Sequence, residues 1–300
     1  MISFVNAKIN IGLQIVRKRE DGYHDLQTVF YPVGLYAGTA ENPESFCDII
    51  ELTGPVGKGS PALPEFILTG RKIECPLEKN LIYKAADLFC RETGADFSET
   101  LVSLEKYLPD GAGMGGGSAD AGFILKMMAS AYNDIIGEGE KISDESLCEM
   151  ALQLGADCPF FIINRPAYAE GVGERLEEIP LNLSGYWLAV VKPDIYVSTK
   201  EAFSGVTPKP SEFNLRMLID LPIEKWKDKV KNDFEDSIFP LYPAIKEIKE
   251  QLYLRGAIYA SMSGSGSSIY GIYSSEKSAK EALRDFAVNT TIEALYLLKL

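Results

Sequence analysis

The amino-acid sequence predicts an α+β protein built in two lobes. Segments with the period-2 alternation of a strand and segments with the 3.6-residue period of a helix both occur, but they do not alternate as strictly as in a parallel α/β sheet. The chain has 300 residues, of which 46% are hydrophobic and 24% charged. These values are ordinary for a folded protein, and the length fits about two domains of roughly 150 residues each. We therefore predict an N-terminal domain over 1–160 and a C-terminal domain over 161–300.

The chain opens with a predicted β-hairpin. Residues 4–16 alternate, so that apolar side chains line one face of a strand while Asn6, Lys8 and Asn10 line the other. A charged cluster at 17–21, followed by glycine, predicts a turn, and residues 23–33 are typical of a second strand.

Glycines and capping residues mark the elements that follow. Gly94 and Gly155 stand where helices are expected to end, and Ser143 stands where one is expected to begin. Up to residue 163 the sequence predicts, in order, a Gly/Pro-rich loop at 53–65, a helix at 80–93, a strand at 100–108, a helix through 121–132, a helix at 143–154 and a short apolar strand at 160–163. Beyond residue 165 it predicts a buried strand at 186–191, a loop at 204–214, helices around 214–220 and 239–255, a strand pair within 257–273, a helix at 275–286 and a last strand near 293–299.

Composition excludes several classes of function. The 30 basic and 43 acidic residues give a net charge of −13, which disfavours a general nucleic-acid binder and a protein that binds anionic membranes. The single histidine, His24, excludes multi-histidine zinc sites and is the only imidazole that could serve a Ser or Cys nucleophile. The five cysteines include no C-x-x-C pair, and no run of about 18 apolar residues occurs, so we expect a cytoplasmic protein with reduced thiols.

A glycine-rich segment carries the strongest chemical signal. Residues 111–118 contain five glycines, follow a predicted strand, and lead through Ser118 and Asp120 into a helix. Such a loop can hold phosphate, because glycine lets backbone N–H groups approach an anion at a helix N-terminus. The alternative is a flexible loop without a ligand.

Two other glycine motifs do not fit this segment. Its spacing matches G-x-G-x-x-G, but a polar loop follows the helix where a dinucleotide-binding fold needs a second parallel strand. A P-loop needs G-x-x-x-x-G-K-[ST], and the nearest match, around Lys58, lacks the first glycine, the hydroxyl residue and the helix that should follow.

Three further features allow either a functional or a structural interpretation. The Gly/Ser-rich stretch at 261–268 is either a hairpin turn or a second backbone clamp on the same anion. Lys8 and Asn10 lie side by side on one strand face, which is either the solvated side of an edge strand or part of a site. Asp157 precedes an apolar run, and is either a turn residue or a partly buried carboxylate that needs a cationic partner such as a lysine.

Five motifs, in their order along the chain, resemble those of the GHMP small-molecule kinases. They are Ala7-Lys-Ile-Asn-Ile-Gly12, Asp21-Gly-Tyr-His-Asp-Leu26, the glycine loop from Pro109 to Ala121, Leu154-Gly-Ala-Asp-Cys-Pro-Phe160 and Met262-Ser-Gly-Ser-Gly266. The first two and the fourth resemble most the members that phosphorylate a cytidine diphosphate-linked methylerythritol in the non-mevalonate isoprenoid pathway, and the Asp-Gly-Tyr-His element is the most discriminating. The chain departs from the family's usual residues at Met114, Ala119, Gly122 and Ser267.

This resemblance implies a fold and a reaction. The fold would be two-lobed, with an N-terminal nucleotide-binding lobe, a C-terminal ferredoxin-like α/β-sandwich lobe and the active site in the cleft. The reaction would transfer the γ-phosphoryl group of ATP to the 2-hydroxyl of the methylerythritol moiety with Mg²⁺ as cofactor, and Asp157 and Lys8 would flank that hydroxyl. The partners would be ATP and the cytidyl substrate, with neither nucleic acid nor membrane, and the protein would be a monomer or a homodimer.

The resemblance also assigns binding residues. Tyr23 would stack on the cytosine base and His24 would reach its edge. The substrate-binding set is Asn10, Tyr23, His24, Thr199 and Phe203. The ATP-binding set is Asn80, Lys106, Pro109, Asp110, Gly111, Ala112, Gly113, Met114, Gly115, Gly116, Gly117 and Ser118, of which Ser118 is also the candidate magnesium ligand. Two alternatives stay open: a GHMP kinase for another small alcohol such as mevalonate or homoserine, and a non-catalytic nucleotide-binding protein.

Overall fold

The computed structural model describes residues 1–34, 46–73 and 75–300. The described residues form two compact units, each made of several stretches of chain. The first unit holds the described parts of Met1–Ala7, Ala37–Asp110 and Gly115–Asn164, and the second holds those of Lys8–Tyr36, Gly111–Met114 and Arg165–Leu300. The domain boundary near residue 160 stays a prediction, because the compact units are discontinuous in sequence.

The first unit contains strands in the order β5 (Glu65–Gly70), β7 (Leu101–Lys106), β3 (Cys47–Thr53) and the beginning of β1 (Ile2–Lys18). β3 pairs antiparallel with both β1 and β7, while β5 pairs parallel with β7. A short pair, β4 (Gly57–Lys58) with β6 (Ala95–Asp96), lies within the same unit. The glycine-rich segment follows shortly after the end of β7 in this sheet.

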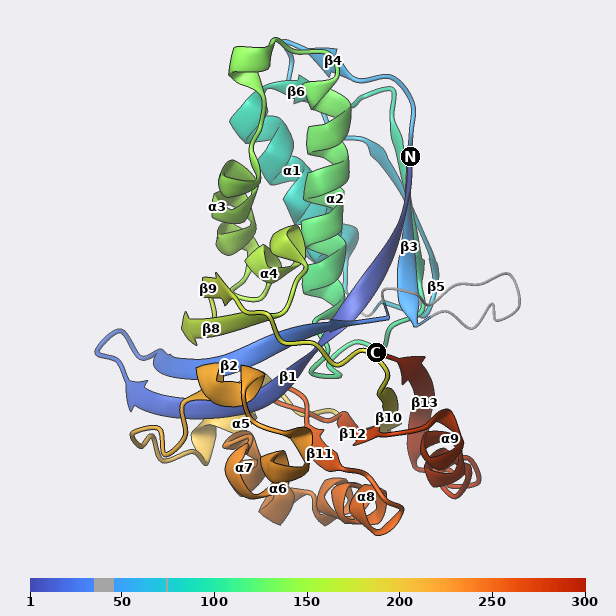
Figure 1. Cartoon of the computed structure of the whole chain (residues 1–300). Coiled ribbons are helices and arrows are strands. Elements are labelled where there is room, and N and C mark those ends of the chain that lie inside the picture. The colour runs from blue at the N-terminus through green and yellow to red at the C-terminus, as the bar shows by residue number, and fades with distance from the viewer. Residues whose placement is uncertain (35–45, 74) are drawn as a thin grey trace. The chain divides into compact units, whose positions relative to one another are not determined.

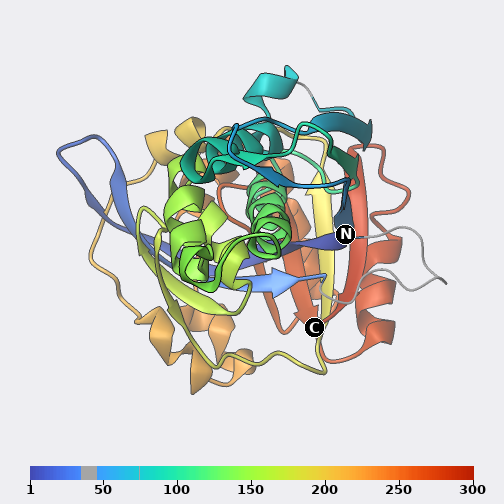
Figure 2. The same ribbon diagram turned by 90° about the horizontal axis from the view of Figure 1, so that it is seen from above.

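Helices α1 (Leu81–Thr93), α2 (Gly116–Asn133), α3 (Asp144–Leu154) and α4 (Cys158–Ile163) stand beside these strands (Figure 1). α1 packs along α2, as the view from above also shows (Figure 2), and α2 packs on β3. Side chains cap two of the helices: Asn80 Oδ1 accepts a hydrogen bond from the N–H of Ile82 at 3.0 Å, and the Ser143 hydroxyl accepts one from the N–H of Ser146. The helices predicted at 80–93 and 143–154 are thereby confirmed, together with the predicted cap at Ser143. The cap at Asn80 was not predicted.

The second unit contains the part of β1 from Lys8 onward. β1 turns back into β2 (His24–Val33), which confirms the predicted hairpin. β2 pairs antiparallel with β8 (Ala167–Gly171), and β8 pairs antiparallel with β9 (Arg175–Glu178). The hairpin brings the motifs around Lys8 and His24 into one unit.

A separate four-stranded sheet completes the second unit. Its antiparallel strands run in the order β11 (Tyr259–Met262), β12 (Ile269–Tyr273), β10 (Trp187–Pro193) and β13 (Ile292–Lys299). α8 (Pro243–Leu254) precedes β11 and packs on β11 and β12, while α9 (Glu276–Arg284) joins β12 to β13 and packs on β10 and β12. This strand–helix–strand–strand–helix–strand order is ferredoxin-like, so the predicted fold class is confirmed.

A long connection links β10 to α8. It contains α5 (Thr199–Ser204), α6 (Trp226–Lys229) and α7 (Phe234–Leu241), with 3₁₀ turns at Leu215–Ile219 and Ile223–Lys225. Further 3₁₀ turns lie at Leu77–Lys79 and Glu138–Glu140 in the first unit. Phe234 and Ile238 of α7 pack into the same core as Ile245 and Leu252 of α8, so this connection belongs to the body of the second unit.

Three predicted elements differ in the structure. The apolar run at 160–163 is part of helix α4 and not a strand. Pro159 fits the first turn of a helix. Four apolar residues alone do not distinguish a helix from a strand. The helix predicted over 239–255 is two helices, because α8 begins anew at Pro243. α2 begins at Gly116, which places Gly117 and Ser118 in its first turn.

The fold also explains one departure from the family's pattern. A Cβ on Gly122 of α2 would lie 2.7 Å from Cβ of Phe161, so the close approach of α2 and α4 requires glycine there. The five cysteines form no disulfide. Within the ranges that the structure describes, no helix is long and apolar enough to cross a membrane.

Candidate active site

The glycine loop leads from the end of β7 into the N-terminus of α2. Gly111, Gly113 and Gly115 have positive φ angles of 62°, 71° and 74°. Gly115 is the N-cap of α2, and no side chain caps this end. The first N–H groups of a helix lack partners within it, and they carry the positive end of the helix dipole. The loop therefore offers backbone donors suited to an anion such as phosphate.

Residues 111–114 of this loop lie on the second Gly/Ser-rich stretch, within the second unit. The Ser263 hydroxyl donates to the carbonyl of Gly113 at 2.8 Å, and the N–H of Ser268 donates to the carbonyl of Ala112 at 3.4 Å. The side-chain amide of Asn232 donates to the carbonyls of Met262 and Gly264, both at 2.8 Å. The structure thus brings the two Gly/Ser stretches together, as the clamp interpretation predicts, and Asn232 holds the second one in place.

Gly113 is the tightest point of this contact. A Cβ there would lie 1.9 Å from the carbonyl oxygen of Ser263, and the φ of 71° is itself unfavourable for other residues. We expect Gly113→Ala to lower the free energy of unfolding by about 2–4 kcal/mol and to weaken nucleotide binding, since overpacking and left-handed strain add. Urea unfolding checks this prediction. Gly137→Ala is the matched control, because nothing lies near its Cβ position; equal stabilities of the two variants would contradict the account.

Lys8 and Asn10 of β1 are buried, with only 3% and 2% of their surfaces exposed. The interpretation of this strand face as a solvated edge is therefore wrong; β2 and the loop 261–268 cover it. Lys8 Nζ donates to Asn10 Oδ1 at 2.6 Å and lies 4.8 Å from the centre of the Phe30 ring. Asn10 Nδ2 donates to Thr28 Oγ1 at 3.0 Å. The network fixes the position of the Lys8 ammonium.

This network touches the glycine loop directly. The N–H of Lys8 donates to the carbonyl of Met114 at 3.0 Å. The N–H of Asn10 donates to the Ser263 hydroxyl at 3.3 Å, the same hydroxyl that donates to Gly113. Within the second unit, one serine thus joins the lysine strand to the phosphate loop.

Asp157 lies in the first unit, immediately before α4. It is half-buried at the N-cap position, but its side chain caps no N–H of that helix. The residues that follow it, Cys158 and Pro159, are buried. Because Asp157 and Lys8 belong to different units, their joint action on one hydroxyl stays a prediction.

The structure brings together two of the predicted substrate residues. The rings of His24 and Phe203 stack with centroids 4.8 Å apart and planes at 17°, and Phe203 in turn meets Phe234 edge-on. Burial lowers the pKa of His24, and the charge of Lys18 lowers it further. The imidazole is therefore neutral near pH 7, with one donor and one acceptor nitrogen. Thr199 begins the helix that carries Phe203, and Tyr23 is 65% exposed.

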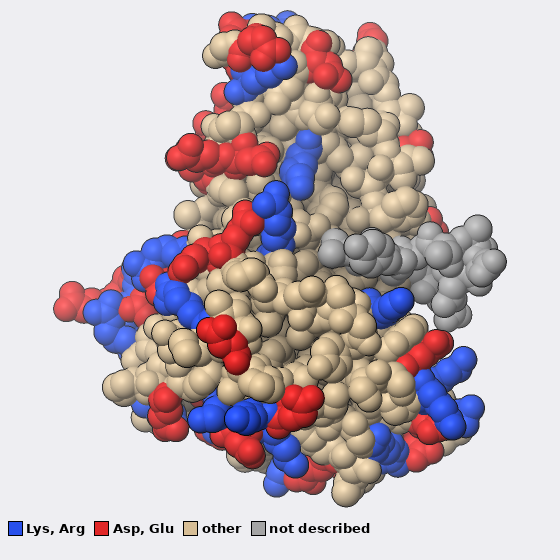
Figure 3. Space-filling view, viewed as in Figure 1, with Lys and Arg blue, Asp and Glu red and all other residues tan. Residues whose placement is uncertain are grey.

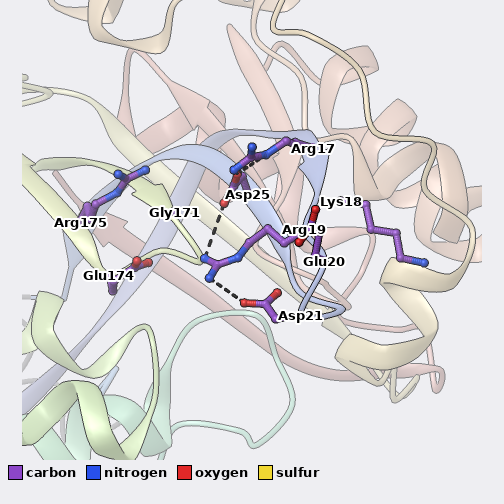
Figure 4. A pocket seen from close by; sticks show the side chains of 9 residues that line it. All are labelled: Arg17, Lys18, Arg19, Glu20, Asp21, Asp25, Gly171, Glu174 and Arg175. Atoms are coloured by element: carbon purple, nitrogen blue, oxygen red, sulfur yellow. Dashed lines mark hydrogen bonds and ion pairs between the residues drawn. The ribbon is translucent and has the colours of Figure 1, made fainter.

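A charged groove of about 710 Å³ lies at the turn between β1 and β2 (Figure 4). It is lined by Arg17, Lys18, Arg19, Glu20, Asp21, Asp25, Gly171, Glu174 and Arg175. Arg17 contacts Asp25 at 2.6 Å, and Arg19 contacts Asp21 at 2.6 Å. Side chains of both charge signs gather where β1 turns into β2 (Figure 3). These ion pairs join residues on either side of Tyr23 and His24 and within the turn before them.

Lys106, a predicted nucleotide residue, is buried in a charged cluster of the first unit. Its Nζ lies 2.5 Å from Asp48 Oδ2 and 2.7 Å from Asp120 Oδ2, and the three side chains are at most 2% exposed. Burial raises the pKa of Asp120, whereas the Lys106 charge opposes that shift. Asn80, the other predicted nucleotide residue outside the loop, is the N-cap of α1.

Sequence reasoning missed two residues in the first unit, Asp48 and Asp120, and two in the second, Asn232 and Tyr196. Asp48 and Asn232 are buried polar residues, and Asp48 could have been noticed as the one acid on the inward face of an apolar strand. The sequence marks Asp120 only as the end of the glycine segment. Tyr196 is 72% exposed, and its ring lies so close to Gly111 that a Cβ added to that glycine would be 2.7 Å from the ring. No periodic pattern in the sequence marks Tyr196.

Comparisons with known proteins agree with this geometry. The family description "GHMP kinases N terminal domain" matches residues 80–165, and "GHMP kinases C terminal" matches residues 222–289. A 4-diphosphocytidyl-2-C-methyl-D-erythritol kinase of Bacteroides fragilis is 45% identical over 279 residues, covering 92% of this chain and 93% of the relative. The enzyme of the same name from Chlorobium phaeobacteroides is 34% identical, covering 93% and 91%.

Solved structures show the same relationship. The crystal structure of a 4-(cytidine 5′-diphospho)-2C-methyl-D-erythritol kinase matches with a TM-score of 0.77 and 28% identity, covering 100% of both chains. A homoserine kinase from Cytophaga hutchinsonii matches with a TM-score of 0.67 and 17% identity, covering 99% of this chain and 95% of that one. The second likeness shows the shared fold alone.

Proposed function

Because the chain belongs to the 4-diphosphocytidyl-2-C-methyl-D-erythritol kinase family of GHMP kinases, we propose that it transfers the γ-phosphoryl group of ATP to the 2-hydroxyl of 4-diphosphocytidyl-2-C-methyl-D-erythritol. The single observation that carries phosphoryl transfer is the Ser263 contact. Its hydroxyl joins the glycine loop at Gly113 to the strand of the buried Lys8. A fixed ammonium beside a phosphate cradle is what this reaction needs.

The reaction proceeds by direct displacement at the γ-phosphorus. The 2-hydroxyl oxygen forms the new P–O bond, the bond from the γ-phosphorus to the β,γ-bridging oxygen breaks, and ADP leaves with that oxygen. Asp157 orients the hydroxyl and accepts its proton. Lys8 stabilises the charge on the transferring group, and the backbone N–H groups of the glycine loop hold the phosphates of ATP.

Ser118 is the residue that would face a magnesium ion brought to the site with ATP. Among the described residues, no three His, Cys, Asp or Glu side chains gather into a metal site. This agrees with the usual binding of Mg²⁺ through few protein groups together with substrate phosphates. Ser118, partly exposed in the first turn of α2, is the residue proposed to face it. Bound there, the ion would neutralise phosphate charge.

Substrate recognition is proposed to rest on the stacked pair of His24 and Phe203. A neutral imidazole held on an aromatic ring can present one donor and one acceptor to a cytosine edge, while exposed Tyr23 offers a stacking surface. We expect Phe203→Leu to raise the KM for the cytidyl substrate about 2- to 12-fold, since the aromatic pair that holds His24 in place is worth roughly 0.5–1.5 kcal/mol beyond its buried area. Steady-state kinetics measures this. Phe203→Tyr should stay near the parent, and an unchanged KM in Phe203→Leu would exclude the role.

The product tests the function most simply. The purified protein is incubated with Mg-ATP and 4-diphosphocytidyl-2-C-methyl-D-erythritol, and phosphorus NMR with mass spectrometry identifies the product. We expect one added phosphomonoester, on the 2-hydroxyl, with one ADP formed for each. ADP release without such a product would refute the proposal.

A further inference from the structure

We propose that Asp48 and Asp120 are positioning residues for the glycine loop, and that Lys106 links them beneath the start of α2. This inference rests on the proposed function, because it assigns the loop to phosphate binding. None of the three residues needs to touch the nucleotide to act in this way.

The first observation is that Asp48 fixes the entry to the loop. Its Oδ1 accepts hydrogen bonds from the N–H groups of Tyr107 at 2.6 Å and Leu108 at 2.8 Å. These are the two residues directly after β7 and directly before Pro109. One carboxylate on β3 thereby sets the direction in which the chain leaves the sheet.

The second observation is that Asp120 fixes the exit from the loop. It lies in the second turn of α2, and its Oδ2 accepts from Lys106 Nζ at 2.7 Å. The same ammonium donates to Asp48 Oδ2 at 2.5 Å. The two ends of the loop are thus tied to one buried ammonium, which in turn is anchored on β7.

The third observation is that Gly116, at the end of the glycine loop, lies close to the Lys106 ammonium. A Cβ on Gly116, the first residue of α2, would lie 3.2 Å from Lys106 Nζ, so the helix start rests almost on the ammonium. The ammonium and the helix dipole are both positive, and the two carboxylates balance them. The cluster of Asp48, Lys106 and Asp120 therefore sets the position and direction of the backbone N–H groups at the start of α2, which we propose bind phosphate.

Burying this charged cluster also has a cost in desolvation free energy. Buried ion pairs often contribute little to stability, because removing the charges from water offsets their attraction. Asp120 Oδ1 is buried without a hydrogen-bond partner. An apolar contact between β7 and α2 would hold the layers together equally well, so the charges serve the placement of the loop.

Two replacements of one side chain separate positioning from stability. Asp120→Asn keeps an acceptor for Lys106 and places its amide where the unpartnered oxygen stands. Asp120→Leu has a similar shape but cuts the link. Both leave the balanced pair of Lys106 and Asp48. For each variant we would measure the affinity for Mg-ADP by calorimetry, the KM for both substrates, and the stability by urea unfolding. Lys58→Met, which removes an exposed ion pair, is the control.

We expect Asp120→Leu to bind Mg-ADP about 10- to 100-fold more weakly, since small misplacements of binding groups are costly. Its KM for the cytidyl substrate should stay unchanged, and Asp120→Asn and Lys58→Met should stay within about 3-fold of the parent. Equal ADP affinity in folded Asp120→Leu and Asp120→Asn would overturn the inference while leaving the function intact. A parent protein that does not bind Mg-ADP would instead refute the proposed function.

Asp48→Asn provides a second test if Asp120→Leu does not fold. An asparagine has one acceptor oxygen, so it cannot serve both Lys106 and the N–H groups of Tyr107 and Leu108. We expect the folded variant to lose ADP affinity to a similar degree, about 10-fold or more. Parental affinity in this variant would also overturn the inference.

Discussion

Asp157→Asn should lower kcat by about 10²- to 10⁴-fold, the usual contribution of a positioned general base. Asparagine keeps the shape of the side chain but cannot accept the proton of the acceptor hydroxyl. Because the Asp157 side chain caps no N–H of α4, its replacement should leave that helix and the binding of Mg-ADP close to those of the parent. Single-turnover kinetics with ATP and the cytidyl substrate measures the chemical step.

Asp144→Asn is the matched control for this result. Asp144 also lies at the N-terminus of a helix in the first unit, but it is exposed and belongs to the acidic first turn of α3. Its kcat should equal that of the parent. If Asp157→Asn retained comparable turnover, the assignment of the base would be wrong.

Lys8→Met should lower kcat by about 10²- to 10³-fold, as the loss of one electrostatic contact to the transition state typically does. Methionine fills the space of the lysine stem but carries no charge. The proposal places the ammonium at the transferring group, which ADP lacks, so the affinity for Mg-ADP should change little. Stopped-flow kinetics and calorimetry on the same preparation separate the two quantities.

Lys8→Arg sharpens this prediction. The Lys8 ammonium is buried against Asn10 and the Phe30 ring, and a planar guanidinium does not fit a site made for a compact ion. The arginine variant should therefore remain impaired although it keeps the charge. A kcat within 3-fold of the parent in Lys8→Met would show that the lysine is structural.

Local patterns were sufficient to predict much of the fold. The alternation of 4–16 predicted β1. The apolar spacing of 80–93 with Gly94 predicted α1, and the cap at Ser143 predicted α3. The ferredoxin-like order followed from the family resemblance. The run at 160–163 failed because a short apolar stretch has no period, and its state was decided by Pro159 and by packing on α2. No element was predicted for β3, β5, β8, β9 or α5.

The candidate site was predicted only in part, because its contacts join distant residues. Ser263 meets Gly113 across 150 positions, and Lys106 meets Asp48 across 58. A single sequence shows which residues can carry charge or donate hydrogen bonds, but not which of them the fold places together. Motif resemblance selected Lys8, His24 and Phe203 as candidates, and their roles stay predictions. Asp48 and Asn232 belong to no motif that was recognised.

The ratio of kcat/KM values for competing acceptors tests the central claim most directly. One preparation is assayed for ADP release with 4-diphosphocytidyl-2-C-methyl-D-erythritol, homoserine and mevalonate under identical conditions. The account predicts a preference for the cytidyl substrate of about 10³-fold or more, since buried polar groups left unpaired reject a wrong substrate strongly. Equal or greater kcat/KM with homoserine or mevalonate would contradict it.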